Sequence, residues 1–229
     1  MPDLTNNERL RQIANALEEM NAEVVYVGGA VIQLYSTDGA ARNPMTTTDV
    51  DCALDISSYG DFMAFQDRLY AKHFLNDTEE GAPICRYIFN GEKVDFMPKE
   101  DTGIGESNRW YPMGIRCRQS RRLDTGEVIY VMPVAYYLAS KLDALHSRGG
   151  DDYRGEKDFE DIVFVLNTCE QVATEVLDSN DPALRAYMKE EFTRMLLRPN
   201  LREEIECALL EDNRVDYIIE RMRRISVQE

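Results

Sequence analysis

The chain has 229 residues, 42 of them acidic and 26 basic, which gives a formal net charge of −16 at pH 7. This excess of acid disfavours a nucleic-acid substrate, because binding to a polyanion depends largely on lysine and arginine neutralising phosphates. The hydrophobic fraction of 44% suffices for a core, and no apolar run reaches the length of a membrane span, so we expect a protein that does not enter a membrane. The 5 scattered cysteines form no Cys-x-x-Cys pair, which is typical of reduced cysteines in a cytoplasmic protein.

The first half of the chain alternates helical and extended patterns. Thr5 and Glu8 form a capping-box pattern before apolar residues at helical spacing, which predicts that a helix begins there. Asn90-Gly91 separates two apolar runs, and this pair favours the type I′ turn of a β-hairpin. The predicted elements that follow the first helix are strands at 23–27 and 50–54, helices at about 29–35 and from about 61 onward, the hairpin strands 84–89 and 93–97, and two strands around the turn at 124–126.

A helical half begins at Pro133, and the change of pattern there predicts two domains, 1–132 and 133–229. Helices are predicted at about 134–147, 157–178, 182–197, 200–211 and 213–225. The glycine-rich segment 148–155 is either a mobile loop that closes over a ligand or a plain helix–helix connection. The fold class predicted from these elements is α+β, a mixed sheet followed by a helical subdomain.

Three aspartates and a glycine pair carry the chemistry of the first half. In a strand, side chains alternate between the two faces, so Asp49 and Asp51 should point the same way while Val50 packs into the core. Asp95 lies on the second strand of the hairpin, and Gly28-Gly29 ends an earlier strand. Adjacent carboxylates repel one another unless a cation neutralises them, and Mg²⁺ prefers such oxygen ligands. Asp-x-Asp alone is common on turns and solvated strand faces, so the order of all these elements carries the prediction.

This order resembles the DNA polymerase β-type nucleotidyltransferase superfamily. Gly28, Gly29, Asp49, Asp51 and Asp95 each match a position of its pattern: a glycine turn, an Asp-x-Asp strand and a third acidic residue on a later strand. The resemblance implies a polymerase β-like core that binds an NTP with two Mg²⁺ ions held by the three aspartates. It further implies transfer of a nucleoside monophosphate to a hydroxyl, with the two glycines holding phosphate.

Two positions depart from that pattern. Ala30 follows the glycine pair where many members have a phosphate-binding serine, so backbone N–H groups would have to carry more of the phosphate contact. Arg42 lies several residues before Thr48, whereas some members have the arginine closer to the Asp-x-Asp strand.

A second resemblance covers residues 133–144 and 157–162. These segments are similar to the helical part of the AbiEii-like toxins of type IV toxin–antitoxin systems and their uncharacterised relatives. The resemblance implies that Lys141 faces the nucleotide phosphates, that Asp158 lies on a helix that supports the site, and that an antitoxin protein is a partner. From the residues alone, Lys141 could equally extend to solvent and Asp158 could only stabilise a helix N-terminus.

The acceptor of the transferred nucleotide is left open between tRNA, a protein and a small molecule. A toxin-like enzyme acting on tRNA fits the helical resemblance, a transferase acting on a cationic compound of aminoglycoside type fits the charge, and a non-enzymatic nucleotide-binding module is the third alternative. The only local basic cluster near the expected sheet is interpreted as a charged edge strand or as a group that steers a triphosphate. It comprises Arg116, Arg118, Arg121 and Arg122, with Arg116 and Arg118 expected on one strand face. A last basic group is expected on the solvent face of the final helix and comprises Arg221, Arg223 and Arg224.

Overall fold

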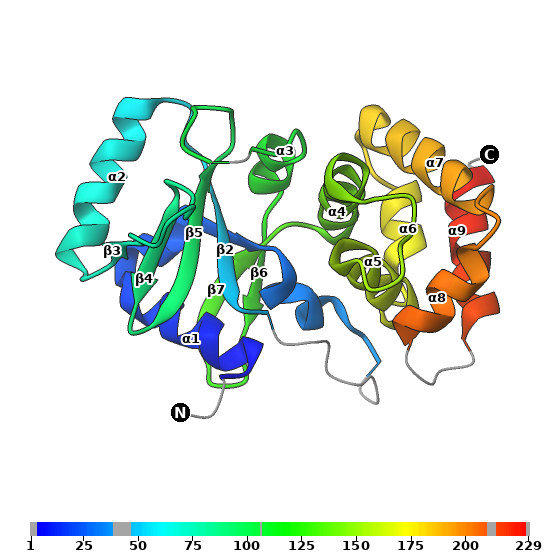
Figure 1. The fold of residues 1–229 in the computed structure, drawn as a ribbon, viewed down its shortest axis with the longest axis horizontal. Helices are drawn as coiled ribbons and strands as arrows, with labels where there is room; N and C mark the ends of the chain where they lie inside the picture. The colour runs from blue at the N-terminus through cyan, green and yellow to red at the C-terminus, as the bar shows by residue number, and fades with distance from the viewer. Residues whose placement is uncertain (1–3, 39–46, 106, 210–213, 228–229) are drawn as a thin grey trace. The chain divides into compact units, whose positions relative to one another are not determined.

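The computed structural model describes residues 4–38, 47–105, 107–209 and 214–227. The chain forms two compact units (Figure 1), of which unit 1 comprises Met1–Val31 with Met45–Pro133, and unit 2 comprises Ile32–Pro44 with Val134–Glu229. Arg42 lies outside the described residues. The segment that starts at Ile32 thus groups with the C-terminal helices, although the sequence analysis assigned it to the first domain.

Unit 1 contains a seven-stranded mixed sheet, which confirms the α+β class (Figure 1). The strand order is β3-β4-β5-β2-β1-β7-β6, in which β2–β5 and β1–β7 are parallel pairs and the remaining pairs are antiparallel. The strands are β1 Val24–Val27, β2 Asp49–Leu54, β3 Leu75–Asn76, β4 Arg86–Phe89, β5 Glu92–Pro98, β6 Gln119–Arg122 and β7 Val128–Val131. Because β3 and β6 are the outer strands, β2 and β5 lie inside the sheet.

The helices of the first half begin where the sequence supplies a cap. The Thr5 side chain accepts a hydrogen bond from the Glu8 N–H while the Glu8 carboxylate accepts one from the Thr5 N–H, which confirms the predicted capping box. Ser58 caps α2 in a similar way by accepting from the Asp61 N–H. The helical segments are α1 Asn6–Leu17, the 3₁₀ helices η1 Glu18–Glu23 and η2 Gly29–Tyr35, α2 Tyr59–Ala71 and α3 Tyr111–Arg116.

Helix α2 covers one face of the sheet. Phe65 of α2 lies 5.5 Å from Phe96 of β5, measured between ring centroids, and Gln66 donates a hydrogen bond to the Tyr87 hydroxyl at 2.6 Å. Side chains alternate along β5, so Phe96 and Asp95 point to opposite faces. The apolar core under α2 therefore leaves Asp95 and its neighbours on the other face.

Helix α3 corrects one prediction. Arg116 is the last residue of α3 and does not share a strand face with Arg118. Pro112 lies in the first turn of this helix, where its missing N–H and fixed φ are tolerated, and the Cys117 N–H bonds the Met113 carbonyl at the other end. The strand β6 begins only at Gln119, so the expected edge strand is shorter than the arginine cluster.

Among its described residues, unit 2 contains six α-helices together with the end of the 3₁₀ helix η2. They are α4 Val134–Arg148, α5 Lys157–Thr168, α6 Val172–Leu177, α7 Pro182–Leu196, α8 Leu201–Leu209 and α9 Val215–Val227. Asp181 caps α7 and Pro182 occupies its first turn, so this helix begins where it was predicted to begin. The prediction of a single helix at 157–178 is wrong, because the helix is interrupted between α5 and α6. No helix in the described part of the chain is both long enough and apolar enough to span a membrane.

The break after α5 is made by residues distant in sequence. The last carbonyls of a helix have no partner within it. Arg221 donates to the Leu166 and Cys169 carbonyls at 2.7 and 2.6 Å, and the Thr37 N–H donates to the Thr168 carbonyl at 3.0 Å. These tertiary donors end α5 where no glycine or proline marks a boundary, and they show that the predicted solvent-facing position of Arg221 is wrong.

Candidate metal centre

Three aspartates meet on one face of the sheet in unit 1. The parallel pairing of β2 with β5 sets Asp51 directly beside Asp95, and Asp49 lies two residues earlier on the same face of β2. One carboxylate oxygen from each of the three lies within 4.8 Å of the others. Val50 between the two aspartates of β2 is fully buried, which confirms the predicted alternation. The sheet therefore gathers the three predicted carboxylates into one group.

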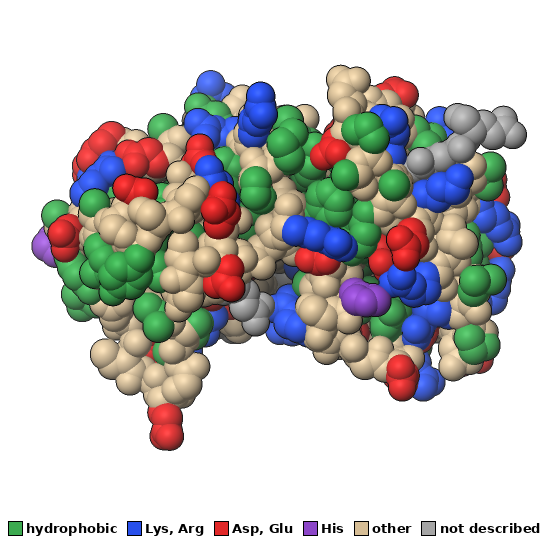
Figure 2. Space-filling view, turned by 90° about the horizontal axis from the view of Figure 1, so that it is seen from above, with side chains coloured by type: hydrophobic (Ala, Val, Ile, Leu, Met, Phe, Trp, Pro, Cys, Tyr) green, Lys and Arg blue, Asp and Glu red, His purple; other side chains and the backbone are tan. Residues whose placement is uncertain are grey.

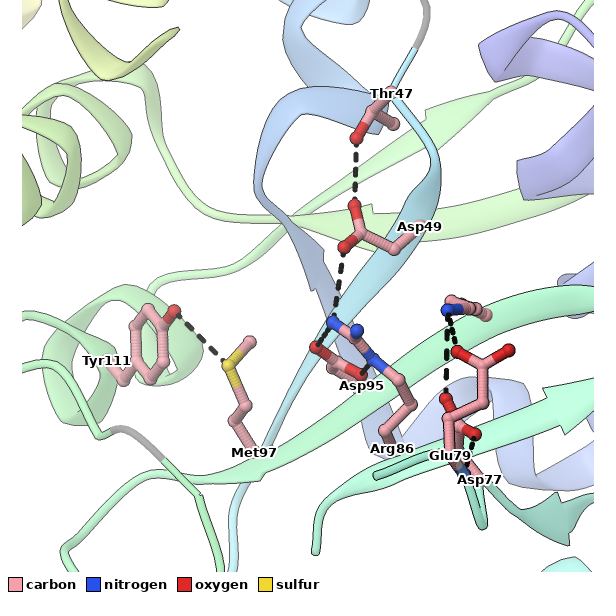
Figure 3. A network of polar contacts seen from close by, with 9 residues as sticks. Thr47, Asp49, Asp77, Glu79, Arg86, Asp95, Met97 and Tyr111 are labelled. Carbon is pink, nitrogen blue, oxygen red and sulfur yellow. Dashed lines mark hydrogen bonds and ion pairs between the residues drawn. The ribbon is translucent and has the colours of Figure 1, made fainter. Parts of the chain in front are cut away.

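Arg86 binds two members of this triad (Figure 3). Its Nε and Nη2 atoms donate to the two oxygens of Asp95, each at 2.7 Å, and Nη2 also donates to Asp49 Oδ2 at 3.3 Å. The hydrogen bonds to Asp95 raise the pKa of the Arg86 guanidinium above its ordinary value, so the group is a permanent cation. A bidentate contact of this kind is the strong form of an arginine–carboxylate pair.

The sequence analysis did not identify Arg86, although a signal was present. Phe89 pairs with Glu92 across the Asn90-Gly91 turn, and counting three residues away from the turn along each strand of the antiparallel hairpin places Arg86 opposite Asp95. Residues directly opposite in such a pair lie on the same face. Register counting from the two-residue turn would therefore have found this arginine.

Gly28, the residue directly after β1, lies against Asp51 of the triad. Its φ of +68° is a conformation that residues with a side chain rarely adopt, and a Cβ built at this position would lie 1.9 Å from Asp51 Oδ2. A glycine is thus required here both by the backbone and by the carboxylate beside it. Gly29 begins the 3₁₀ helix η2, which agrees with the short helix predicted from this point.

The side chains at the triad offer the kind of ligand atoms that a hard cation such as Mg²⁺ binds. The Thr47 hydroxyl donates to Asp49 Oδ1 at 2.8 Å and fixes that carboxylate (Figure 3). Burial, with the negative charge of Asp95 adding to it, raises the pKa of the nearby Cys85 thiol to about 12, so this sulfur stays protonated and does not compete as a thiolate ligand. Among the described residues, the side chains grouped at the centre as possible metal ligands offer carboxylate oxygens, which Mg²⁺ prefers, and the space kept free by Gly28 accommodates Asp51.

Lys141 and Asp158, the other two predicted site residues, lie together in unit 2. Lys141 Nζ is 3.0 Å from Asp158 Oδ1 and 2.5 Å from Asp161 Oδ2, and Arg148 binds the second oxygen of Asp158 at 2.9 Å. Burial lowers the pKa of Lys141, but the carboxylates of Asp161 and Asp158 outweigh it and the pKa is raised overall. Burial in turn raises the pKa of Asp161. The lysine is therefore a buried cation between two carboxylates, and it does not extend into solvent.

The glycine-rich segment 148–155 is held by hydrogen bonds within unit 2. Glu204, which is only 1% exposed, accepts from the Tyr153 N–H and binds Arg198, whose guanidinium stacks on the Tyr153 ring at 3.6 Å. Arg198 also donates to the Asp151 carbonyl at 2.7 Å. These contacts favour the plain helix–helix connection over the mobile loop.

The arginines of the β6 region have local partners. Arg118 stacks on Tyr130 at 4.9 Å, Arg121 donates to the Gln119 side chain at 2.7 Å, and Arg122 donates to the Gly126 carbonyl at 2.9 Å. On the face seen in Figure 2, basic and acidic side chains lie interspersed and form no continuous basic surface. The position of β6 at the edge of the sheet agrees with the charged edge strand proposed from the sequence.

Comparison with known proteins adds nothing to these geometric arguments. No protein-family model matches the chain, and no curated protein is detectably similar to it.

Proposed function

We propose that this protein is a metal-dependent nucleotidyltransferase that moves a nucleoside monophosphate from an NTP to a hydroxyl. One observation carries the proposal: Asp49, Asp51 and Asp95 present their carboxylates within 4.8 Å on one face of the sheet. The resemblance to the polymerase β-type superfamily and the Gly28-Gly29 turn beside the triad support it. Paired carboxylates on one sheet face are typical of sites that bind Mg²⁺ for phosphoryl chemistry.

The proposed chemistry assigns a role to each residue. When bound, Mg²⁺ would neutralise phosphate charge and lower the pKa of the acceptor hydroxyl. Asp49 and Asp51 would hold the cation, and the backbone N–H groups at Gly28-Gly29 would contact phosphate oxygens. The acceptor oxygen forms a bond to the α-phosphorus, its proton passes to an oxygen of Asp95, and the bond to the leaving pyrophosphate breaks. Lys141 receives no step in this scheme, because Asp158 and Asp161 already neutralise it.

The test is a calorimetric titration of each of the four NTPs into the full chain, with Mg²⁺ and with EDTA. Asp51→Asn removes one charge from the triad while keeping the size of the side chain. Asp55→Asn is the matched control, because Asp55 follows the same strand and pairs with Lys99 at 2.6 Å away from the triad. We expect Mg²⁺-dependent binding in wild type and Asp55→Asn and its loss in Asp51→Asn. Equal binding in all three proteins, or none in any of them, would contradict the proposal.

Two acceptor classes remain in the proposal, and two observations favour the second. A toxin-like enzyme acting on tRNA agrees with the helical resemblance. A transferase for a small cationic acceptor agrees with the net charge of −16. It also agrees with the hydrogen bonds that Arg121 and Arg122 of β6 donate to nearby groups of the chain itself. Incubation with the preferred NTP, labelled in its α-phosphate, and either bulk tRNA or a panel of aminoglycosides separates them. Label transferred to tRNA would support the toxin-like reading, and label transferred to an aminoglycoside would support the other.

A further inference from the structure

Thr47 makes hydrogen bonds in two directions, toward the triad and toward helix α1. Its hydroxyl donates to Asp49 Oδ1 at 2.8 Å (Figure 3), and its backbone N–H donates to the side-chain Oδ1 of Asn6 at 3.1 Å. Asn6 is the first residue of α1 and is only 6% exposed. A continuous path of hydrogen bonds therefore connects α1 to one carboxylate of the proposed metal centre.

The sheet itself does not hold Thr47 in place. The pairing of β2 with β5 begins at Asp49, and its pairing with β1 begins at Asp51, so Thr47 lies before the paired part of the strand. A backbone N–H outside a strand ladder finds its partner in a side chain or in water. Asn6 is that partner here, and it fixes the position of Thr47 where strand pairing does not.

Helix α1 is a firm support for this contact. Leu10 and Ile13 of the helix are fully buried, and Arg9 forms an ion pair with Glu92 at the start of β5. Residues three apart on a helix lie on the same face, so Asn6 and Arg9 act from one side of α1. They attach the helix to the segment before β2 and to the start of β5, which are the two strands that carry the triad.

The carboxylate of Asp49 needs such support because it is only partly enclosed. Its side chain is 26% exposed, and its Oδ2 atom accepts from Arg86 at the longer distance of 3.3 Å. Within the described part of the chain, the Thr47 hydroxyl therefore makes the shorter of the two hydrogen bonds that orient this carboxylate. Hydrogen bonds of this kind orient a metal-binding carboxylate, and the loss of one typically weakens metal binding by about 10–100-fold.

We propose that Asn6 is a positioning residue of the metal centre, and that it acts through Thr47 on the orientation of Asp49. The inference rests on the proposed function in that it takes the triad to bind a divalent cation. It deepens that function, because it makes helix α1 part of the machinery that holds a metal ligand. Neither Asn6 nor Thr47 would touch the cation, and both would fix where Asp49 presents its oxygens.

The experiment measures Mn²⁺ affinity of the full chain without nucleotide, from the electron paramagnetic resonance signal of free Mn²⁺ during a titration. Thr47→Val removes the hydroxyl and should weaken binding by about tenfold or more, and Thr47→Ser should recover most of that loss. Asn6→Ala keeps the hydroxyl but removes its anchor, so binding should weaken by about three- to tenfold, at or below the lower end of the range for such partners. Asn15→Ala is the matched control and should bind like wild type, because Asn15 lies on the same helix and donates to Glu127 at 3.1 Å.

The double variant that combines Asn6→Ala with Thr47→Val separates positioning from a general loss of structure. If Asn6 acts through the Thr47 hydroxyl, the double variant should bind Mn²⁺ as weakly as Thr47→Val and no more weakly. If the two residues act independently, their fold-losses multiply. Multiplied losses, or wild-type affinity in a folded Asn6→Ala protein, would overturn the inference.

Amide hydrogen exchange of the wild-type protein decides the matter if Asn6→Ala does not fold. The Thr47 N–H should exchange slowly because Asn6 accepts its hydrogen bond, and exchange at the rate of an unprotected amide would overturn the inference. No Mn²⁺ binding in wild type would overturn both the metal centre and the inference. The expected Mn²⁺ affinities combined with absent NTP binding would support the role of Asn6 and refute the transferase.

Discussion

Replacing Gly28 by alanine should damage both the stability of the protein and its affinity for a divalent cation. Two physical effects add at this position. The backbone φ of +68° disfavours any residue with a Cβ, and the new Cβ would lie 1.9 Å from Asp51 Oδ2. The first effect concerns only the chain conformation, whereas the second displaces a proposed ligand.

The magnitudes follow from these two effects. A left-handed conformation costs a residue other than glycine about 1–2 kcal/mol. Moving Asp51 Oδ2 from 1.9 Å to a separation of 3.0 Å, below which real Cβ contacts are essentially never found, requires a displacement of 1.1 Å. Overpacking of this kind typically adds about 1–3 kcal/mol, so the free energy of unfolding should fall by about 2–5 kcal/mol. Metal-binding geometry tolerates only about 0.2 Å, so the Mn²⁺ affinity should fall by about tenfold or more.

Gly103→Ala is the matched control for this change. Gly103 has a φ of +73°, and a Cβ there would meet nothing within 4 Å, so the control measures the backbone effect without the contact. Urea unfolding and Mn²⁺ titration of both variants and wild type provide the assay. If Gly28→Ala loses no more stability than Gly103→Ala and binds Mn²⁺ like wild type, the geometric reasoning about Asp51 is refuted.

Three further predictions concern buried charges and thiols. Lys141→Met should lower the free energy of unfolding, measured in urea, by about 3–5 kcal/mol, because it leaves two buried carboxylates without their cation. The pKa of this lysine is raised above its ordinary 10.5, so its contribution is full below pH 10.5 and falls as the pH rises from there toward the raised pKa. A difference in stability from wild type that does not narrow above pH 10.5 would contradict the assignment. Arg221→Ala should lower the free energy of unfolding by about 2–4 kcal/mol, because the carbonyls at the end of α5 lose the hydrogen bonds that Arg221 donates. Arg223→Ala removes only an exposed ion pair and should change the urea midpoint little. Equal effects of the two substitutions would argue against the role of Arg221 at the end of α5. Iodoacetamide at pH 9 should label the exposed Cys117 in the native protein but Cys85 only after unfolding. The reason is that burial and the charge of Asp95 raise the pKa of the Cys85 thiol to about 12. Labelling of Cys85 in the native protein, detected by mass spectrometry, would count against its buried position.

Two parts of the triad could be predicted from local rules. Alternation along β2 places Asp49 and Asp51 on one face, and the Asn90-Gly91 turn fixes the hairpin that carries Asp95. No local pattern predicts that β5 pairs in parallel with β2. This tertiary pairing is what places Asp95 beside Asp51. The hairpin register places Arg86 opposite Asp95, so this arginine was predictable from the Asn90-Gly91 turn as well.

Features set by distant partners could not be predicted in this way. The apolar periodicity of 157–178 continues through the break after Thr168, so the local sequence does not mark the end of α5. The donors at that end, Thr37 and Arg221, come from other parts of the chain. Lys141 shows the same limit. Its helical neighbours suggested a side chain that reaches solvent, and only the packing of α5 against α4 supplies the two acids that bury it.

The grouping of Ile32 and the residues after it with the C-terminal helices has a consequence for modularity. The chain passes between the two units three times, at Val31/Ile32, at Pro44/Met45 and at Pro133/Val134. A fragment that starts at Val134 would therefore lack Thr37, and α5 would lose a hydrogen bond at its C-terminal end. The helical unit therefore cannot be separated from unit 1 by cutting the chain at a single point. Recombination between relatives of such a protein would have to exchange both segments together to keep either unit intact.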